Sequence, residues 1–244
     1  MTELLEVRKA KKSSTASAEP WPSSLYARPS RPAAPAAPAE AFVAEDIAEG
    51  CRLALQTLGI DGVTSLGITS SLRAEGRTTL ALAMALVLAD HGADTVLVEL
   101  DLAHPSLGQR LAVAKYPGLG DLAAGLAELS EAMHPIRDGL KLIPAGQIYD
   151  SIPHALSQLA RADVLGELAN QGHTVVADLP PLLGNSTGRQ AASMMSDLVL
   201  VVRAGVVPAG SIKEAVAGLP VTPKVLLNGT HTRVPSWALR LSGI

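Results

Sequence analysis

Three polar segments of this sequence stand directly after runs of Val, Leu and Ile, and their residue types suit the binding of phosphate and a divalent cation. They read SLRAEGRTT at residues 71–79, ELDLAHP at 99–105 and DLPP at 178–181. The first combines glycine, arginine and hydroxyl groups, whereas the other two contribute carboxylates. Backbone N–H groups at a helix N-terminus bind phosphate, and carboxylates bind Mg²⁺. We therefore treat the three segments as parts of one candidate site.

The first segment lies between an apolar strand and an apolar helix, which is the arrangement that a phosphate-binding loop requires. In such a loop a lysine contacts the β- and γ-phosphates and a hydroxyl holds magnesium. Gly76 and Thr78 fit this pattern. Arg77 stands where the lysine belongs, and it carries its charge on a planar guanidinium instead of a compact ammonium. The alternative is an ordinary helix start, which explains Thr78 and Thr79 but not the two further motifs at strand ends.

The second and third segments place acidic residues at strand ends. Glu99 and Asp101 stand two residues apart and so share one side of a strand, where they could organise Mg²⁺ or accept a proton from an attacking hydroxyl. Asp178 could hold a metal-bound water at the tip of another buried strand. The alternative for each carboxylate is a charge that only terminates a strand. The three segments together are more specific than any one of them.

An alternation of short β-branched runs with helix-length segments, which begins near Glu40, must position these motifs and is typical of an α/β domain. The expected strands are 63–69, 95–101, 140–144, 174–178, 197–203 and 224–228. The expected helices are 44–58, 76–91, 119–131, 153–171, 187–195 and 209–218. The strands are nearly continuous in Val, Leu or Ile, which indicates a parallel sheet covered on both faces. Ligands bind beyond the carboxyl ends of such strands, where the three polar segments fall.

Residues 1–40 differ from the rest of the chain, and we expect them to form a flexible Pro/Ala-rich tail that precedes one domain over 41–244. They hold six of the 17 prolines and show no periodic apolar face. The basic cluster Arg8, Lys9, Lys11 and Lys12 could contact an anionic membrane surface, although a solubilising tail is the interpretation that we favour.

The composition argues against several classes of function. Aromatic residues make up 2% of the chain and the net charge is −3, so neither base stacking nor a basic field favours nucleic-acid binding. One cysteine cannot form an internal disulfide, the N-terminus is charged where a signal peptide would be apolar, and no apolar run is long enough to span a bilayer. The six histidines lack the spacing of a zinc site. We therefore expect a cytoplasmic protein.

Taken in order, the three segments resemble the motifs of the bacterial tyrosine kinases of capsule and exopolysaccharide synthesis, the CpsD/CapB type, which are relatives of the ParA/MinD group of P-loop ATPases. The family's loop resembles SSxPGEGKST, with which residues 70–79 are compatible apart from the substituted lysine and Pro-Gly. The second motif resembles LLIDADLRRP, and Asp101 and Pro105 match it. The third resembles VIIDTPP, and Asp178, Pro180 and Pro181 match it. The likeness extends over about residues 48–228.

The resemblance implies a three-layer α/β/α P-loop fold with a mostly parallel, doubly wound sheet, and ATP and Mg²⁺ as cofactors. The residues that would bind the nucleotide are Ser71, Ala74, Glu75, Gly76, Arg77, Thr78, Thr79 and Asn228. The residues that would hold magnesium are Thr78, Asp101 and Asp178. The residues that would act in catalysis are Asp101, Glu99 and Arg77. For Asn228, a turn-forming Asn-Gly pair is the alternative.

Departures from the family's pattern predict weakened or lost catalysis. Arginine replaces the lysine at 77, glutamate replaces an aspartate at 99, and Arg73-Ala74 replaces Pro-Gly. A residue other than glycine at 74 would cost about 1 kcal/mol if the loop needs a positive φ there. The family's C-terminal tyrosine cluster is also absent, since the chain has only Tyr26, Tyr116 and Tyr149.

We therefore expect a P-loop ATPase or tyrosine-kinase-like protein of exopolysaccharide or capsule synthesis and export. Its partner would be the cytoplasmic tail of a Wzz-like membrane polysaccharide co-polymerase, and its location cytoplasmic or peripheral at the inner face of the membrane. One alternative is a ParA/MinD-like ATPase that positions a cargo, although Leu72 stands where that group has its signature lysine. The other is a nucleotide-free structural adaptor.

The expected helix at 44–58 resembles the family's ring-forming ExxRxxR segment. Glu49 and Arg52 match this pattern, whereas Leu55 replaces the last arginine. We therefore expect a monomer or a weak homo-oligomer. A buried amphipathic helix with two exposed charges is an equally weighted alternative.

Overall fold

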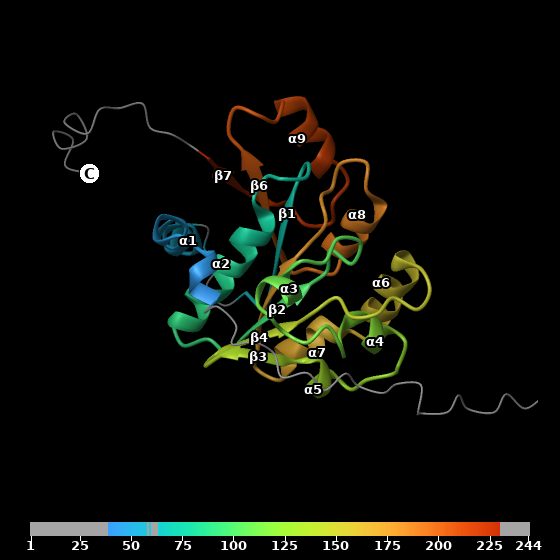
Figure 1. The fold of residues 1–244 in the computed structure, drawn as a ribbon. Helices are drawn as coiled ribbons and strands as arrows, with labels where there is room; N and C mark the ends of the chain where they lie inside the picture. The colour runs from blue at the N-terminus through green and yellow to red at the C-terminus, as the bar shows by residue number, and fades with distance from the viewer. Residues whose placement is uncertain (1–38, 58, 60–62, 230–244) are drawn as a thin grey trace, which may run out of the picture. The chain divides into compact units, whose positions relative to one another are not determined.

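The computed structural model describes residues 39–57, 59 and 63–229, which fold around one seven-stranded sheet (Figure 1). The strands are β1 (Ser65–Ser70), β2 (Thr95–Glu99), β3 (His134–Arg137), β4 (Leu140–Ile143), β5 (Thr174–Asp178), β6 (Asp197–Arg203) and β7 (Lys224–Asn228). The helices before β3 are the 3-10 helix η2 (Ala39–Phe42), α1 (Glu45–Thr57), α2 (Arg77–Asp90), α3 (Leu107–Arg110), α4 (Leu119–Ala123) and α5 (Leu129–Ala132). Those after β4 are α6 (Ile152–Arg161), α7 (Val164–Asn170), α8 (Ser186–Ala192) and α9 (Ala209–Val216).

The strand order is β3-β4-β2-β5-β1-β6-β7, and every neighbouring pair is parallel except β3 and β4. The chain adds strands on one side of β1, returns to insert β5 between β1 and β2, and then continues on the other side. This confirms the predicted mostly parallel, doubly wound sheet. It also brings the carboxyl ends of β1, β2 and β5 next to one another.

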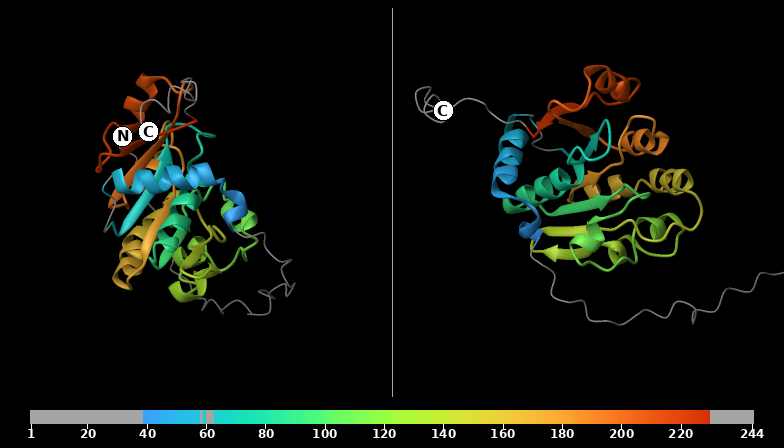
Figure 2. Two further views of the ribbon diagram at one scale, coloured as in Figure 1. Left: turned by 90° about the vertical axis from the view of Figure 1, so that its left-hand side faces the viewer. Right: turned by 45° about the horizontal axis from the view of Figure 1, so that its top comes forward.

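Two apolar cores lie on opposite faces of the sheet and produce three layers (Figures 1 and 2). One core includes α1, α2 and α3, and the other includes the helices α4 to α9. Alternate residues of a strand enter opposite cores, as in β6, where Leu198 and Leu200 face one layer and Val199 and Val201 face the other. The predicted α/β/α layering is therefore confirmed.

Helix α2 runs through the centre of its layer, and all of residues 80–87 are buried. A helix that is apolar on every side must be covered on every side. The sheet covers the inner side of α2, and α1 covers the outer side through Cys51 and Leu55. The helix that carries the candidate loop at its N-terminus is thus held firmly on both faces.

Apart from η2, which was not expected, the predicted elements differ from the observed ones mainly in four places. Strand β3 was missed because it is a four-residue edge strand that contains a proline, and the short α3 was also missed. The expected helix at 119–131 is divided into α4 and α5 around Gly125, which has φ +68°. The expected helix at 153–171 is divided into α6 and α7 at Asp163, which has φ +47°. A left-handed residue cannot continue a right-handed helix.

The predicted tail falls almost wholly outside the described residues and stays a prediction. Its last two positions, Ala39 and Glu40, belong to η2, and Ala39 is buried in the core beside α2. The domain therefore begins at least two residues before the boundary expected from the sequence. No helix within the described ranges is both long and apolar enough to cross a bilayer.

We predict that the single thiol of the chain reports on the packing of α1. Cys51 is fully buried, and burial raises its pKa to about 11. Because the thiolate is the reactive form, a disulfide reagent should react with the folded protein at about pH 8 at least about a hundredfold more slowly than with the urea-unfolded chain. The measurement is the release of the reagent's chromophore with and without urea. Equal rates would show that α1 is not packed on α2.

Candidate functional site

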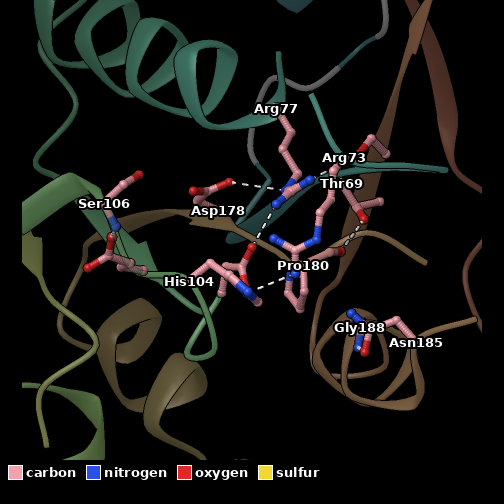
Figure 3. Close-up of polar contacts among 12 residues, drawn as sticks. Thr69, Arg73, Arg77, His104, Ser106, Asp178, Pro180, Asn185 and Gly188 are labelled. Atoms are coloured by element: carbon pink, nitrogen blue, oxygen red, sulfur yellow. Dashed lines mark hydrogen bonds and ion pairs between the residues drawn. The ribbon is translucent and has the colours of Figure 1, made fainter. Parts of the chain in front are cut away.

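The three polar segments meet at the carboxyl edge of the sheet, as the sequence predicts. Because β5 lies between β1 and β2, the segment that follows it contacts both neighbours. The backbone N–H groups of Leu100 and Asp101 both donate to the carbonyl of Asp178, at 3.0 and 3.1 Å. On the other side, the Thr69 hydroxyl donates to the carbonyl of Pro180 at 2.8 Å (Figure 3). These bonds fix the strand ends in register around the loop.

The loop after β1 contains two residues with positive φ. Ala74 has φ +62° and Gly76 has φ +98°. The conformation at 74 is one that glycine adopts at no steric cost, so alanine there carries the penalty of about 1 kcal/mol expected from the sequence. The loop nevertheless keeps this shape.

Buried Glu75 holds the loop in this shape. One carboxylate oxygen accepts from the N–H of Leu72 at 2.6 Å, and the other accepts from the N–H of Arg203 on β6 at 2.9 Å. Both oxygens are thus committed to the protein backbone. The structure therefore gives Glu75, which the resemblance places among the nucleotide-binding residues, a role in shaping the loop.

The side chain of Asn228, at the end of β7, lies against the same loop. Its Nδ2 donates to the carbonyl of Glu75 at 2.8 Å. A Cβ added to Gly76 would lie 2.3 Å from this Nδ2, closer than van der Waals contact allows. The predicted site residue Asn228 is thus brought to the loop from a distant part of the sequence, and the absence of a side chain at position 76 makes room for it.

We predict that Gly76→Ala destabilises the protein more than its φ alone explains. The matched control is Gly92→Ala, because Gly92 has a similar φ of +87° and a Cβ added there would meet no atom within 4 Å. We expect Gly76→Ala to lower the free energy of unfolding by at least about 1 kcal/mol more than the control, since the Asn228 hydrogen bond must break. Urea denaturation measures both. Equal losses would show that Asn228 does not constrain the loop.

Arg77, the first residue of α2, points its guanidinium into the carboxylates of the site. Nη2 donates to Asp101 at 2.6 Å, Nη1 donates to the hydroxyl of Ser70 at 3.3 Å, and Nε lies 4.0 Å from a carboxylate oxygen of Asp178 (Figure 3). Arg77 is 8% exposed and the two aspartates are 2–3% exposed. The predicted catalytic arginine and two predicted metal ligands therefore form one buried ionic cluster.

The pKa of the Asp178 carboxyl lies well above its ordinary value. Burial raises its pKa to about 7, with smaller contributions from the negative charges of Asp101 and Glu99. A hydrogen bond from Thr78 and the charge of Arg77 act in the opposite direction. Thr78, which the sequence places at the magnesium site, thus lies near enough to Asp178 to lower the pKa of its carboxyl.

We predict that Asp178→Asn removes a pH dependence of stability. The pKa of the Asp178 carboxyl is about 7 in the folded protein against an ordinary value of 3.8, so the folded state binds this proton more tightly. The contribution to stability is complete below the lower pKa and is lost as the pH rises through about 7. Between about pH 5 and about pH 8 the wild type should therefore lose on the order of a few kcal/mol relative to Asp178→Asn.

Thermal melting across this pH range measures the effect. The control is Asp138→Asn, which changes an exposed aspartate in the same way. If Asp178→Asn and the wild type keep parallel pH profiles, Asp178 does not take up a proton on folding in this range.

Glu99 and Asp101 have separate partners although the sequence expects them to act together. Strand β2 ends at Glu99, so Asp101 lies beyond it and turns toward Arg77. Glu99 accepts from the N–H groups of Ser106 and Leu107 at the start of α3 and, at 3.2 Å, from the N–H of Ala145. With both carboxylate oxygens occupied, Glu99 anchors the segment that follows β2.

An arginine and a histidine that lie beside Asp101 were not included among the site residues predicted from the sequence. Arg73 Nη2 and His104 Nδ1 lie 2.7 Å apart, and this pair joins the first segment to the second (Figure 3). The same ring nitrogen is 3.7 Å from Asp101. The signal for Arg73 is present in the sequence, since it replaces a proline of the resembled motif, but only the fold brings His104 to it.

The residues around the loop offer both hydrogen-bond donors and acceptors to a polar ligand. Within the described part of the chain, four buried side-chain atoms at this site have no hydrogen-bond partner. These atoms are Ser71 Oγ, Arg77 Nε, Asp101 Oδ1 and Asp178 Oδ1. The first turn of α2 adds unpaired backbone N–H groups, which favour phosphate. The same residues do not fit a magnesium ion as they are arranged, because the guanidinium already lies between Asp101 and Asp178.

Comparisons of the sequence find distant relatives, and no protein-family model matches the chain. It is 23% identical to the putative tyrosine-protein kinase CapB of Staphylococcus aureus over 71% of this chain and 76% of CapB. It is 25% identical to an uncharacterised ATP-binding protein of Methanocaldococcus jannaschii over 66% of this chain and 60% of that protein. It is 28% identical to the succinoglycan biosynthesis transport protein ExoP of Rhizobium meliloti, of which it spans only 21%.

Solved structures share the fold. The kinase domain of Escherichia coli tyrosine kinase ETK superposes with a TM-score of 0.73 at 22% identity and 88% coverage of both chains. The VpsO kinase domain gives 0.67 at 26% identity, covering 77% of this chain and 96% of that one. MinD from Pyrococcus horikoshii, solved with Mg-ADP, gives 0.56 at 20% identity, covering 72% and 75%.

The resemblance to the bacterial tyrosine kinases is confirmed. In sequence the chain is similar to the tyrosine kinases and transport proteins of capsule and exopolysaccharide synthesis, and its P-loop fold is that of their kinase domains and of MinD. This chain departs from the family's motifs at positions 73, 74, 77 and 99, and all four positions lie in the site described above.

The helix that resembles the family's ring-forming segment is α1, and its charges are paired within the helix. Arg52 donates to Glu45 at 3.0 Å and to Glu49 at 2.8 Å. Leu55, which replaces the last arginine of the pattern, is buried against α2. The role of α1 in assembly stays a prediction, and the structure explains leucine at 55 by packing.

Proposed function

We propose that this chain is a nucleotide-binding P-loop domain of capsule or exopolysaccharide synthesis and export in which phosphoryl transfer is weakened. It would work in the cytoplasm or at the inner face of the membrane. Support comes from relatives named as tyrosine kinases and as a polysaccharide transport protein, and from the convergence of the loop with Asp101 and Asp178.

The engagement of Arg77 carries the proposal of weakened transfer. A P-loop cation accelerates phosphoryl transfer by contacting the β- and γ-phosphates as charge develops on them. Here the guanidinium is held 2.6 Å from Asp101 and faces Asp178. To contact phosphate it would have to leave a buried ion pair, and an uncompensated buried charge costs on the order of 3–5 kcal/mol. Binding therefore suffers less than turnover.

Other residues of the chain have roles in binding that do not depend on Arg77. The N–H groups of the loop and of the first turn of α2 would hold the phosphates, and the unpaired hydroxyl of Ser71 would donate to them. Asp101, with one oxygen unpaired, would accept the proton of an attacking hydroxyl. Bound ATP would supply the phosphoryl group.

The acceptor and the partner would belong to another protein. Among the tyrosines within the described residues, Tyr116 donates to Gln147 at 3.0 Å and Tyr149 donates to Asp121 at 2.9 Å, on the segments around α4. ExoP and the Ralstonia relative named EpsB are several times longer than the part that this chain matches. We propose that this chain works with a separate membrane polysaccharide co-polymerase through that protein's cytoplasmic tail.

A nucleotide-free structural adaptor is the second candidate. The observation that favours it is the ion pair of Arg77 with Asp101. This pair neutralises the positive charge of Arg77 and so weakens the electrostatic attraction of the site for a phosphate. A ParA/MinD-like cargo ATPase has less support, because the position of that group's signature lysine is occupied by Leu72, which is 40% exposed.

Three variants separate these functions. We expect wild-type protein to bind ATP in calorimetry but to transfer phosphate only slowly to a tyrosine-containing peptide. Arg77→Lys should raise the rate at least about tenfold, since an ammonium follows the phosphates more easily than a paired guanidinium. Adding Asp178→Ala should abolish the gain, and Arg161→Lys, an exposed site on α6, should change nothing.

Two results would contradict this function. Fast wild-type turnover that Arg77→Lys lowers would make the protein an enzyme that uses arginine for transfer. Absence of ATP binding in the wild type and in Arg77→Lys would instead support the structural adaptor.

A further inference from the structure

The positive charge that lies between Asp101 and Asp178 belongs to a side chain of the protein, the guanidinium of Arg77. Arg77 Nη2 contacts Asp101, its Nε faces Asp178, and its Nη1 contacts the hydroxyl of Ser70. We propose that this guanidinium permanently takes the place of a divalent metal ion, so that the loop binds its nucleotide in the metal-free form. The proposal rests on the proposed nucleotide binding and specifies the chemical form of the ligand.

The geometry leaves no place for a second cation between these carboxylates. Magnesium requires oxygen ligands at about 2.0–2.1 Å in an octahedral arrangement. Asp101 Oδ2 instead contacts Arg77 Nη2 at 2.6 Å, and Nε of the same guanidinium lies 4.0 Å from Asp178 Oδ1. A metal ion bound there would lie within a few ångströms of a like charge, among side chains that are almost wholly buried.

The neighbours of the two aspartates hold this arrangement in place. The backbone N–H groups of Leu100 and Asp101 bind the carbonyl of Asp178 and fix the separation of the two strand ends.

Arginine is the side chain that can do this, and lysine is not. The planar fork presents several N–H donors in fixed directions, and three of its nitrogens here face three different groups. A lysine has one compact ammonium on a flexible chain, so its three donors all start from a single nitrogen instead of three. The substitution at 77 therefore changes which cation the site uses as well as the shape of the contact.

Groups other than a metal ion would then bind the phosphates of the nucleotide. The loop N–H groups, the first turn of α2 and the free hydroxyl of Ser71 remain available. Arg73 adds a positive charge at the mouth, where it pairs with His104. None of these groups requires a metal ion to bind phosphate.

The first test compares nucleotide affinity with and without magnesium. A fluorescent ADP is the probe, because ADP cannot donate a γ-phosphate and the titration reports binding alone. The dissociation constant of the wild type should agree within about twofold in excess MgCl₂ and in excess EDTA, whereas magnesium should tighten binding to Arg77→Lys at least about tenfold. A tenfold magnesium effect on the wild type would overturn the proposal.

The second test uses Mn²⁺ alone and does not depend on nucleotide binding. Electron paramagnetic resonance of free Mn²⁺ should show no binding to the wild type and one bound ion in Arg77→Ala, which is lost again in Arg77→Ala/Asp101→Asn. Arg161→Ala is the control for loss of an arginine, and thermal melting verifies folding. Manganese bound by the wild type but not by Asp178→Asn would overturn the proposal.

The two tests separate this proposal from the proposed function. If the wild type binds no ADP in either buffer, nucleotide binding is wrong, and the manganese result still decides whether Arg77 fills the cation site. If Arg77→Ala does not fold, the wild type and Arg77→Lys decide it, since manganese should bind to Arg77→Lys and not to the wild type.

Discussion

The candidate site depends on one buried ion pair, between the guanidinium of Arg77 and the carboxylate of Asp101. Both groups are almost wholly removed from water, at 2.6 Å from each other, with Asp178 beside them. A buried charge is tolerated only when it is paired, so each group constrains the other. The direction of the Arg77 side chain, and with it the chemistry left to the loop, follows from this pairing.

The sheet makes the pair possible. Insertion of β5 between β1 and β2 places three strand ends side by side, and backbone hydrogen bonds from Leu100 and Asp101 to Asp178 hold two of them together. Helix α2 cannot shift to relieve the pair, because its residues 80–87 are packed between the sheet and α1. The ionic cluster is therefore set between rigid elements, and its geometry is preorganised.

The loop keeps its shape through contacts to the opposite side of the sheet. Glu75 binds the backbone of β6, and Asn228 at the end of β7 binds the carbonyl of Glu75 across the space that Gly76 leaves free. These bonds offset the strain of a left-handed Ala74. A loop held from β6 and β7 retains the form of a phosphate site even though its lysine has been replaced, which is consistent with retained binding and reduced turnover.

By itself the sequence determined the α/β class, six of the seven strands and the three segments that meet at the site, because apolar runs and strand-end residues are local signals. It could not determine β3 or the breaks at Gly125 and Asp163, which depend on edge pairing and on single left-handed residues. Nor could it determine the partner of any charge. Glu99 and Asp101 are two residues apart in the chain, yet one anchors α3 and the other pairs with Arg77, because ion pairs and hydrogen bonds are chosen by distances in space that only the tertiary structure sets.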